Sequence, residues 1–164
     1  MTENKDEKRI NLLLVDDEEQ FLASTSKRLE MRGFNVIAVN RGDKALESAR
    51  QGPIDVALVD LKMPGMDGEE TLQALKQEHP WMEVIILTGH GSIDSAVECT
   101  KSGAYGYLQK PCEFDRLLEV LTAAYKKKVM NKLRIKEDRM NELLELSQYS
   151  SPMALLKKIK DLDK

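Results

Sequence analysis

The sequence of 164 residues has little cysteine and little histidine, and these shortages exclude some classes of site. It holds two residues of each type. Cys99 and Cys112 follow no metal-binding or redox spacing. No histidine or cysteine is placed to complete a zinc site. Isolated cysteines of this kind are typical of a cytoplasmic protein, whose thiols stay reduced.

Long hydrophobic runs are also missing. No run approaches the roughly 20 apolar residues that a membrane helix needs. Residues 1–9 are charged throughout and lack an apolar core, so we expect a disordered lead-in and not a signal peptide. We therefore expect no association with a membrane.

Two further motifs are absent. The sequence has no GxxxxGK[ST] loop, which excludes a P-loop ATPase module in this chain. It has no helix-turn-helix spacing, and its 5% of aromatic residues are not interleaved with basic ones. We therefore expect no direct binding to nucleic acid.

Charge is unevenly distributed along the chain. Residues 1–125 hold 14 basic and 22 acidic residues, a balance of −8, whereas residues 126–164 hold 11 and 6, a balance of +5. An acidic body is therefore followed by a basic tail, which begins with the three lysines 126–128. We predict a lead-in at 1–9, one globular domain at 10–125 and a helical extension at 126–164.

Short apolar runs alternate with helical patterns through the body. The strands are predicted at 10–15, 35–39, 55–61, 83–87 and 104–108, and the helices at 20–32, 43–51, 69–78, 92–101 and from 113 onward. Five such alternations predict a parallel sheet covered by helices on both faces. Phe21, Thr25 and Leu29 are predicted to form the apolar face of the first helix, and Ile93, Ala96 and Val97 that of the fourth.

Polar residues follow the strand ends. Asp16 and Asp17 follow the first strand, and Asp60, Thr88 and Lys110 follow the third, fourth and fifth. Right-handed crossovers place the carboxyl ends of parallel strands at one edge, where such folds carry their sites. Three carboxylates at one place repel one another and favour a cation, and an oxygen-only ligand set suits Mg²⁺.

An aspartate beside a metal ion and a lysine can attack phosphorus and form an acyl phosphate. Each residue also has a simpler interpretation. Asp16 and Asp17 suit a helix start, Lys110 a solvated loop and Tyr107 a half-buried strand position.

Four motifs, LLLVDDE, LVDLKMPGMDG, ILTGHGS and GYLQKP, occur in this order over residues 10–125. With them the chain resembles the receiver domain of two-component response regulators. The resemblance implies a flavodoxin-like, doubly wound sheet with strand order 2-1-3-4-5, here with an extended C-terminal helix. ILTGHGS resembles receivers that precede ATPase modules in transcriptional activators, so a stand-alone receiver and the front part of a longer regulator both stay open.

The resemblance also implies a role for each site residue. Asp60 would be the phosphoacceptor and a direct Mg²⁺ ligand with Asp17, while Asp16 would act through water. The backbone carbonyl of Lys62 would be a further ligand. Thr88 and Lys110 would hold the phosphoryl oxygens, with the Lys110–Pro111 bond usually cis. The resemblance further implies Tyr107 as the aromatic switch, and Lys62 and His90 as the residues that modulate hydrolysis.

The implied function is a switch that a histidine kinase or phosphotransfer protein phosphorylates. It would not be a dedicated enzyme beyond its own Mg²⁺-dependent phosphorylation and dephosphorylation. The face of helix 92–101, strand 104–108 and helix 113–125 would then change shape and control a partner or dimerisation. Two alternatives remain: a Mg²⁺-dependent phosphatase with Asp16 or Asp17 as nucleophile, and a receiver whose phosphorylation no longer matters.

The tail continues the last helix with a heptad-like pattern. Met130, Leu133, Glu137, Met140 and Leu144 alternate at three and four residues. We expect this helix to pair with its twin in a homodimer; a solvated helix with ion pairs is the alternative. Residues 150–152 should break the helix, and residues 153–162 should form a short amphipathic piece.

Overall fold

The computed structural model describes residues 9–149 together with residues 153, 156, 157 and 160. The chain divides into two compact units, residues 1–128 and 129–164. The predicted lead-in, the predicted helix break at 150–152 and most of the predicted piece at 153–162 lie outside the described residues. Within the part that is described, every helix is too short or too polar to cross a membrane.

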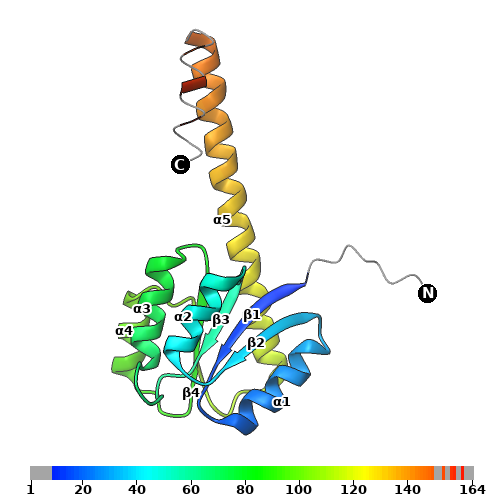
Figure 1. Ribbon diagram of the computed structural model, residues 1–164, viewed down its shortest axis with the longest axis vertical. Helices are drawn as coiled ribbons and strands as arrows, with labels where there is room; N and C mark the ends of the chain where they lie inside the picture. Colours follow the sequence, from blue (N-terminus) through cyan, green and yellow to red (C-terminus); the bar gives the residue numbers. More distant parts are fainter. Residues whose placement is uncertain (1–8, 150–152, 154–155, 158–159, 161–164) are drawn as a thin grey trace, which may run out of the picture. The chain divides into compact units, whose positions relative to one another are not determined.

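Five parallel strands form one sheet in the order β2-β1-β3-β4-β5, and helices connect them (Figure 1). This architecture confirms the predicted fold. The elements in chain order are β1 (Ile10–Val15), α1 (Glu19–Glu30), β2 (Phe34–Val39), α2 (Gly42–Gln51), β3 (Val56–Val59), α3 (Gly68–Glu78), β4 (Glu83–Thr88), α4 (Ile93–Lys101), β5 (Gly106–Gln109) and α5 (Phe114–Tyr149).

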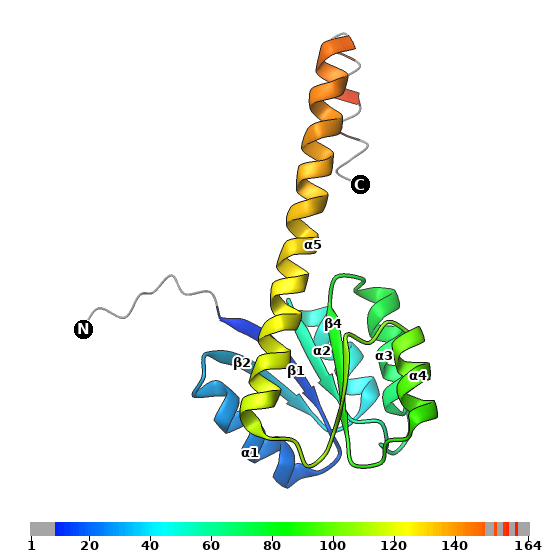
Figure 2. The same cartoon turned by 180° about the vertical axis from the view of Figure 1, so that it is seen from behind.

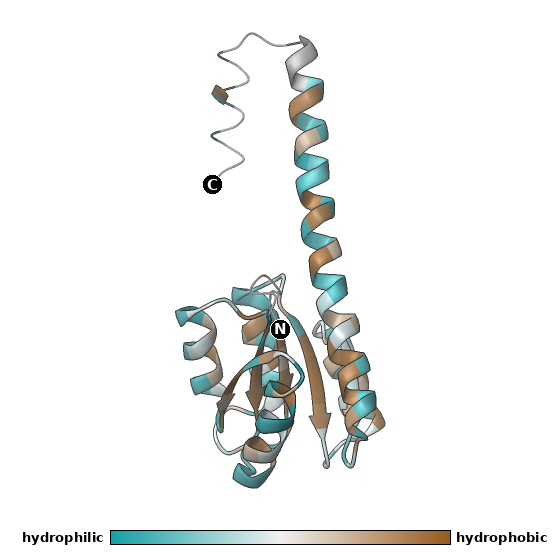
Figure 3. Cartoon of the chain, turned by 90° about the vertical axis from the view of Figure 1, so that its right-hand side faces the viewer, coloured by the Kyte–Doolittle hydropathy of each residue, from teal (hydrophilic) through white to brown (hydrophobic). Residues whose placement is uncertain are grey.

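Helices cover both faces of the sheet because the central strands are apolar on both sides. β1, β3 and β4 are almost entirely buried, and the hydropathy colouring of Figure 3 shows the strands of the sheet mainly in brown. One core lies between the sheet and α2, α3 and α4. The other lies between the sheet and α1 with the first part of α5, which Figure 2 shows in front of the strands. Each crossover therefore leaves the carboxyl ends of all strands at one edge.

Two predicted helix faces differ from those observed. In α1 the buried residues are Leu22, Thr25 and Leu29, whereas Phe21 is only partly buried. In α4, Ile93 is 85% exposed and Val97 46% exposed, and the buried residue is Cys99. An apolar pattern alone does not tell which side of a short helix the sheet covers.

Some observed element boundaries differ from the predicted ones by two residues. β3 ends at Val59, two residues before the predicted end, although Leu61 is still buried in the following loop. β5 begins at Gly106, two residues later than predicted. The first helix ends before Gly33, whose φ of +92° is the left-handed conformation that glycine adopts easily.

Lys128 is buried, although the sequence places it in a basic tail. Its ammonium group pairs with Asp55 just before β3, and these residues are 8% and 5% exposed. Asp55 also accepts a hydrogen bond of 2.8 Å from the Asn11 N–H. One residue earlier, Lys127 Nζ lies 3.8 Å from Oε2 of the buried Glu83 at the start of β4. The first part of α5 is therefore fixed to the amino-terminal edge of the sheet by charge as well as by apolar contact.

The two cysteines should differ in reactivity. Burial raises the pKa of Cys99 to about 11 and also raises that of Cys112. Because the thiolate is the reactive form, a thiol with this pKa is only ~0.1% ionised at pH 8. We expect a disulfide reagent to label Cys112, which is partly exposed, and to reach Cys99 only after unfolding. A Cys112→Ser variant that still labels rapidly in the native state would contradict this.

Candidate metal and phosphoacceptor site

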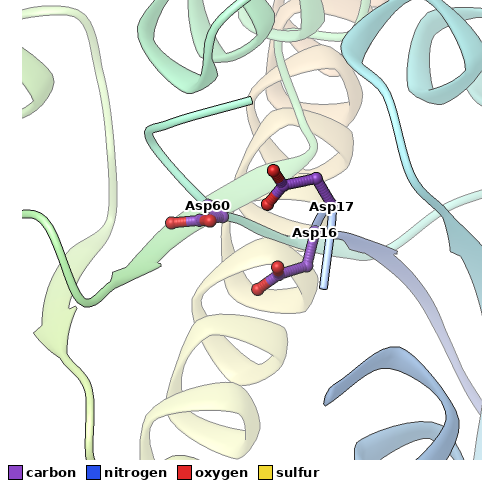
Figure 4. A group of neighbouring side chains, drawn as sticks. All are labelled: Asp16, Asp17 and Asp60. Atoms are coloured by element: carbon purple, nitrogen blue, oxygen red, sulfur yellow. The ribbon is translucent and has the colours of Figure 1, made fainter. Parts of the chain in front are cut away.

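Three carboxylates meet at the carboxyl edge of the sheet. The Asp60 N–H donates to the Val15 carbonyl over 2.9 Å, which places Asp60 beside the end of β1. Asp16 and Asp17 follow β1 directly, and the three side chains project to the same side of the edge (Figure 4). One oxygen from each carboxylate lies within 4.8 Å of the others. The strand register thus gathers the predicted acidic residues in one place.

Lys110 completes the charge arrangement. The residue follows β5, and its N–H donates to the Thr88 carbonyl at the end of β4 over 2.8 Å. Its ammonium group donates to Asp16 Oδ2 over 2.6 Å. The peptide bond between Lys110 and Pro111 is cis, as the family pattern implied.

The site shifts the pKa values of this pair. Burial raises the pKa of Asp16 above its usual value, against the opposing effects of the Lys110 hydrogen bond and the Glu18 N–H. Burial alone would lower the pKa of Lys110, but the hydrogen bond to Asp16 and the charges of Asp16 and Asp60 outweigh it and raise that pKa. Lys110 therefore stays an ammonium ion.

Asp60 has an unused oxygen. The residue is 3% exposed, and its Oδ1 is buried without a hydrogen-bond partner among the described residues. A buried carboxylate oxygen of this kind calls for a cation or a donor. The possible metal ligands around it are carboxylate oxygens, which suit a small hard ion such as Mg²⁺. The residues present therefore fit the predicted metal ion.

The other predicted site residues lie around this centre. Thr88 is fully buried, and its Oγ1 accepts a hydrogen bond of 3.1 Å from the His90 N–H. The side chains of His90 and Lys62 are exposed in the loops after β4 and β3. The fold thus brings together the side chains of Asp16, Asp17, Asp60 and Lys110. Thr88 lies next to this group, and His90 and Lys62 lie at its solvent-exposed rim.

Tyr107 lies on β5 and contacts α4. Its hydroxyl group is 2.8 Å from Ser95 Oγ, and Ser95 belongs to a capping box with Ser92 at the start of α4. A Cβ atom at Gly91 would lie 2.3 Å from the same hydroxyl oxygen. The ring is thus held between α4 and the loop that follows Thr88.

Gly68 holds the loop after Asp60 in place. A Cβ atom at Gly68 would lie 2.1 Å from the Asp60 carbonyl oxygen and 2.6 Å from the Leu61 Cα. The Gly68 N–H donates to the Leu61 carbonyl over 2.8 Å, and Asp67 caps α3. Only glycine allows α3 to begin this close to the backbone of Asp60.

Two neighbours of Lys110 were missed in the sequence. Glu18 Oε1 lies 3.6 Å from the ammonium nitrogen, which also lies 4.0 Å from the centre of the Phe21 ring. Both residues come from the first turn of α1 or just before it. The signal in the sequence was that both residues lie within four positions of Asp17, just after the first strand.

Comparison with known proteins identifies the family of this chain. The model of the response regulator receiver domain family matches residues 12–122. The chain is 40% identical over 116 residues to the transcriptional regulatory protein ZraR of Klebsiella oxytoca, covering 71% of this chain and 26% of that protein. It is 36% identical over 118 residues to a putative NtrX-like response regulator of Rickettsia conorii, covering 71% and 25%. The chain therefore spans about a quarter of the length of these relatives.

A solved structure agrees in fold. The CheY-like receiver domain protein of Methanospirillum hungatei superposes with a TM-score of 0.73 at 29% identity, covering 76% of this chain and 99% of that one. The family match extends over more than half of the chain and contains every residue gathered at the sheet edge. The chain belongs to the response regulator receiver domain family.

Proposed function

We propose that the chain is a phosphorylation-activated switch that accepts a phosphoryl group on Asp60 from a histidine kinase or a phosphotransfer protein. The observation that carries this proposal is the buried Asp60 oxygen without a partner, beside two further carboxylates and one ammonium group. Asp60 is the one acid of the three that is both buried and not engaged by Lys110. A cytoplasmic location fits its two free thiols.

In the proposed reaction a carboxylate oxygen of Asp60 attacks the phosphorus of a phosphohistidine. The new P–O bond forms as the P–N bond breaks, and the imidazole leaves with the electron pair and takes up a proton. Lys110 donates to one phosphoryl oxygen and the Thr88 hydroxyl to another. When bound, Mg²⁺ would supply positive charge close to the transferring group; Asp17 and Asp60, with the Lys62 carbonyl, would hold it, and Asp16 would act through water.

We propose that Thr88 and Tyr107 transmit the effect of phosphorylation from Asp60 to the surface of the domain. A phosphoryl group adds negative charge and acceptor oxygens at Asp60, so the Thr88 hydroxyl would turn toward it. The loop after Thr88 contacts Tyr107, which bonds Ser95 of α4. Movement of the loop would release Tyr107 and shift the packing of the surface formed by α4, β5 and α5. The exposed Lys62 and His90 would modulate the access of water to the phosphoryl group.

The homodimer predicted from the tail belongs to the same proposal. It would let a change at the surface of one receiver reach a second copy. The chain would catalyse only its own phosphorylation and dephosphorylation. The chemistry of a dedicated phosphatase is less well supported, because Asp16 is held by Lys110 and accepts from the Glu18 N–H. Asp17, the other candidate nucleophile, is exposed to solvent.

Mapping the modified residue tests this proposal. We expect incubation with acetyl phosphate and Mg²⁺ to add one phosphoryl group, and a chelator to prevent it. Reduction of the acyl phosphate with borohydride, followed by peptide mass spectrometry, should mark Asp60. A mark on Asp16 or Asp17 would instead support the phosphatase mechanism, and unchanged labelling with the chelator would contradict the need for a metal ion.

A further inference from the structure

Three groups of different chemistry surround the ammonium group of Lys110. Its nitrogen donates to Asp16 Oδ2 over 2.6 Å. The same nitrogen lies 3.6 Å from Glu18 Oε1 and 4.0 Å from the centre of the Phe21 ring, over the face of that ring. Lysine carries its charge on a flexible four-carbon stem. These contacts therefore determine how much of the time the charge stays beside the acids.

Glu18 and Phe21 draw the ammonium group in different directions. The Glu18 side chain is 61% exposed, so a move toward its carboxylate brings the ammonium group toward solvent. Phe21 is partly buried and packs against the core beneath α1. A cavity of about 490 Å³ lies beside Lys110 and is lined by both residues. The ammonium group thus has room to move, and attraction rather than lack of space holds it in place.

The ring suits this task better than an oxygen would. The face of an aromatic ring is negative and attracts a cation without accepting a conventional hydrogen bond. An ammonium group has three N–H bonds, and Asp16 accepts one of them. A carboxylate in the place of the Phe21 ring would accept another and would compete with a phosphoryl oxygen. The ring holds the charge and leaves a donor for the reaction.

We propose that Phe21 is a positioning residue for phosphoryl transfer, whose ring keeps the Lys110 ammonium group beside the acids and ready to donate to a phosphoryl oxygen. The proposal rests on the transfer to Asp60 proposed above and adds the residue that prepares Lys110 for it. Without the ring, the ammonium group would spend part of its time near Glu18 and solvent. The fraction of molecules ready to react, and with it the rate, would fall.

Fluorination of the Phe21 ring tests the proposal, because fluorine withdraws electrons from the ring face with little change of shape. Phe21 is replaced in the full chain by phenylalanine that carries one, two or three ring fluorines. Intact-protein mass spectrometry then measures the rate of phosphorylation by acetyl phosphate and Mg²⁺. We expect the rate to fall with each fluorine, by about threefold to tenfold over the series.

The same series at Phe114 is the matched control. Phe114 packs against the same core, and its ring also lies beneath a cation, with the Arg28 guanidinium carbon 4.0 Å from the ring centre. Fluorination there weakens a contact of the same kind that does not involve Lys110. We expect no trend in the phosphorylation rate along the Phe114 series.

Ordinary substitutions separate positioning from packing. Phe21→Met keeps most of the side-chain volume without the ring and should slow phosphorylation about threefold to tenfold, whereas Phe21→Tyr keeps the ring and should restore the rate. Adding Glu18→Gln to Phe21→Met removes the carboxylate that draws the ammonium group outward and should recover part of the lost rate. A loss of packing alone would not be repaired by a change at Glu18.

Equal rates along the Phe21 series, or the same decline along the Phe114 series, would overturn the role of the ring. A Phe21→Met variant that gains nothing from Glu18→Gln would overturn the competition between the two residues. These results would leave phosphorylation of Asp60 intact. An original chain that takes up no phosphoryl group would overturn the proposed function and this inference together.

Discussion

Replacing Asp60 by asparagine is expected to abolish phosphoryl uptake from acetyl phosphate. The amide has nearly the shape of the carboxylate, so the fold should persist, but its oxygen is a poor nucleophile and carries no charge to attract Mg²⁺. Asp60 is 3% exposed and has an oxygen without a hydrogen-bond partner among the described residues, so this oxygen is available to attack phosphorus. Intact-protein mass spectrometry after incubation with acetyl phosphate and Mg²⁺ measures the uptake.

Asp67→Asn is the matched control for this experiment. Asp67 lies in the loop after Asp60 and accepts a hydrogen bond of 2.9 Å from the Glu70 N–H at the start of α3. Asparagine caps helices as well as aspartate does, so this variant should take up the phosphoryl group as the original chain does. The assignment of Asp60 is wrong if the Asp60→Asn variant reaches the same phosphorylated fraction as the Asp67→Asn variant.

Replacing Lys128 by methionine is expected to cost about 3–5 kcal/mol of unfolding free energy, because it leaves the buried Asp55 carboxylate without its cation. Methionine retains most of the side-chain volume, so loss of packing contributes little. Urea unfolding, followed by the fluorescence of the single tryptophan, Trp81, measures the effect in the unit that holds the pair.

Two further variants separate the ion pair from a general effect of lysine loss. Lys126 is exposed on the same turn, so Lys126→Met should change stability by less than about 0.5 kcal/mol. Asp55→Asn keeps an acceptor for the Asn11 N–H, and combined with Lys128→Met it should cost clearly less than the two single changes added together. Additive effects, or a Lys128→Met variant as stable as Lys126→Met, would show that the pair contributes little.

The sequence was sufficient to predict the order of elements and which polar residues meet at the carboxyl edge of the sheet. Both depend on local patterns: apolar runs of strand length, helical periodicity, and the polar residue after each strand. Asp16, Asp60 and Lys110 could be placed together because parallel strands bring their carboxyl ends to one edge.

Contacts between distant residues could not be predicted in this way. The Lys128–Asp55 pair joins positions 73 residues apart, and the sequence pattern assigned Lys128 to a charged tail. The same limit explains Phe21 and Val97, since periodicity identifies an apolar face without showing whether the sheet or solvent covers it. The role of Ser95 as a partner of Tyr107 also depends on how α4 packs beside β5.

The carboxyl and amino ends of this parallel sheet have different roles. The carboxyl end holds the acids and Lys110, whereas Asp55 and Glu83 at the amino end secure the lysines of α5. Whatever sequence is fused after Lys128 therefore joins a segment that is already anchored and lies apart from the reacting atoms. The sequence after Lys128 can therefore change without altering the residues that carry the chemistry.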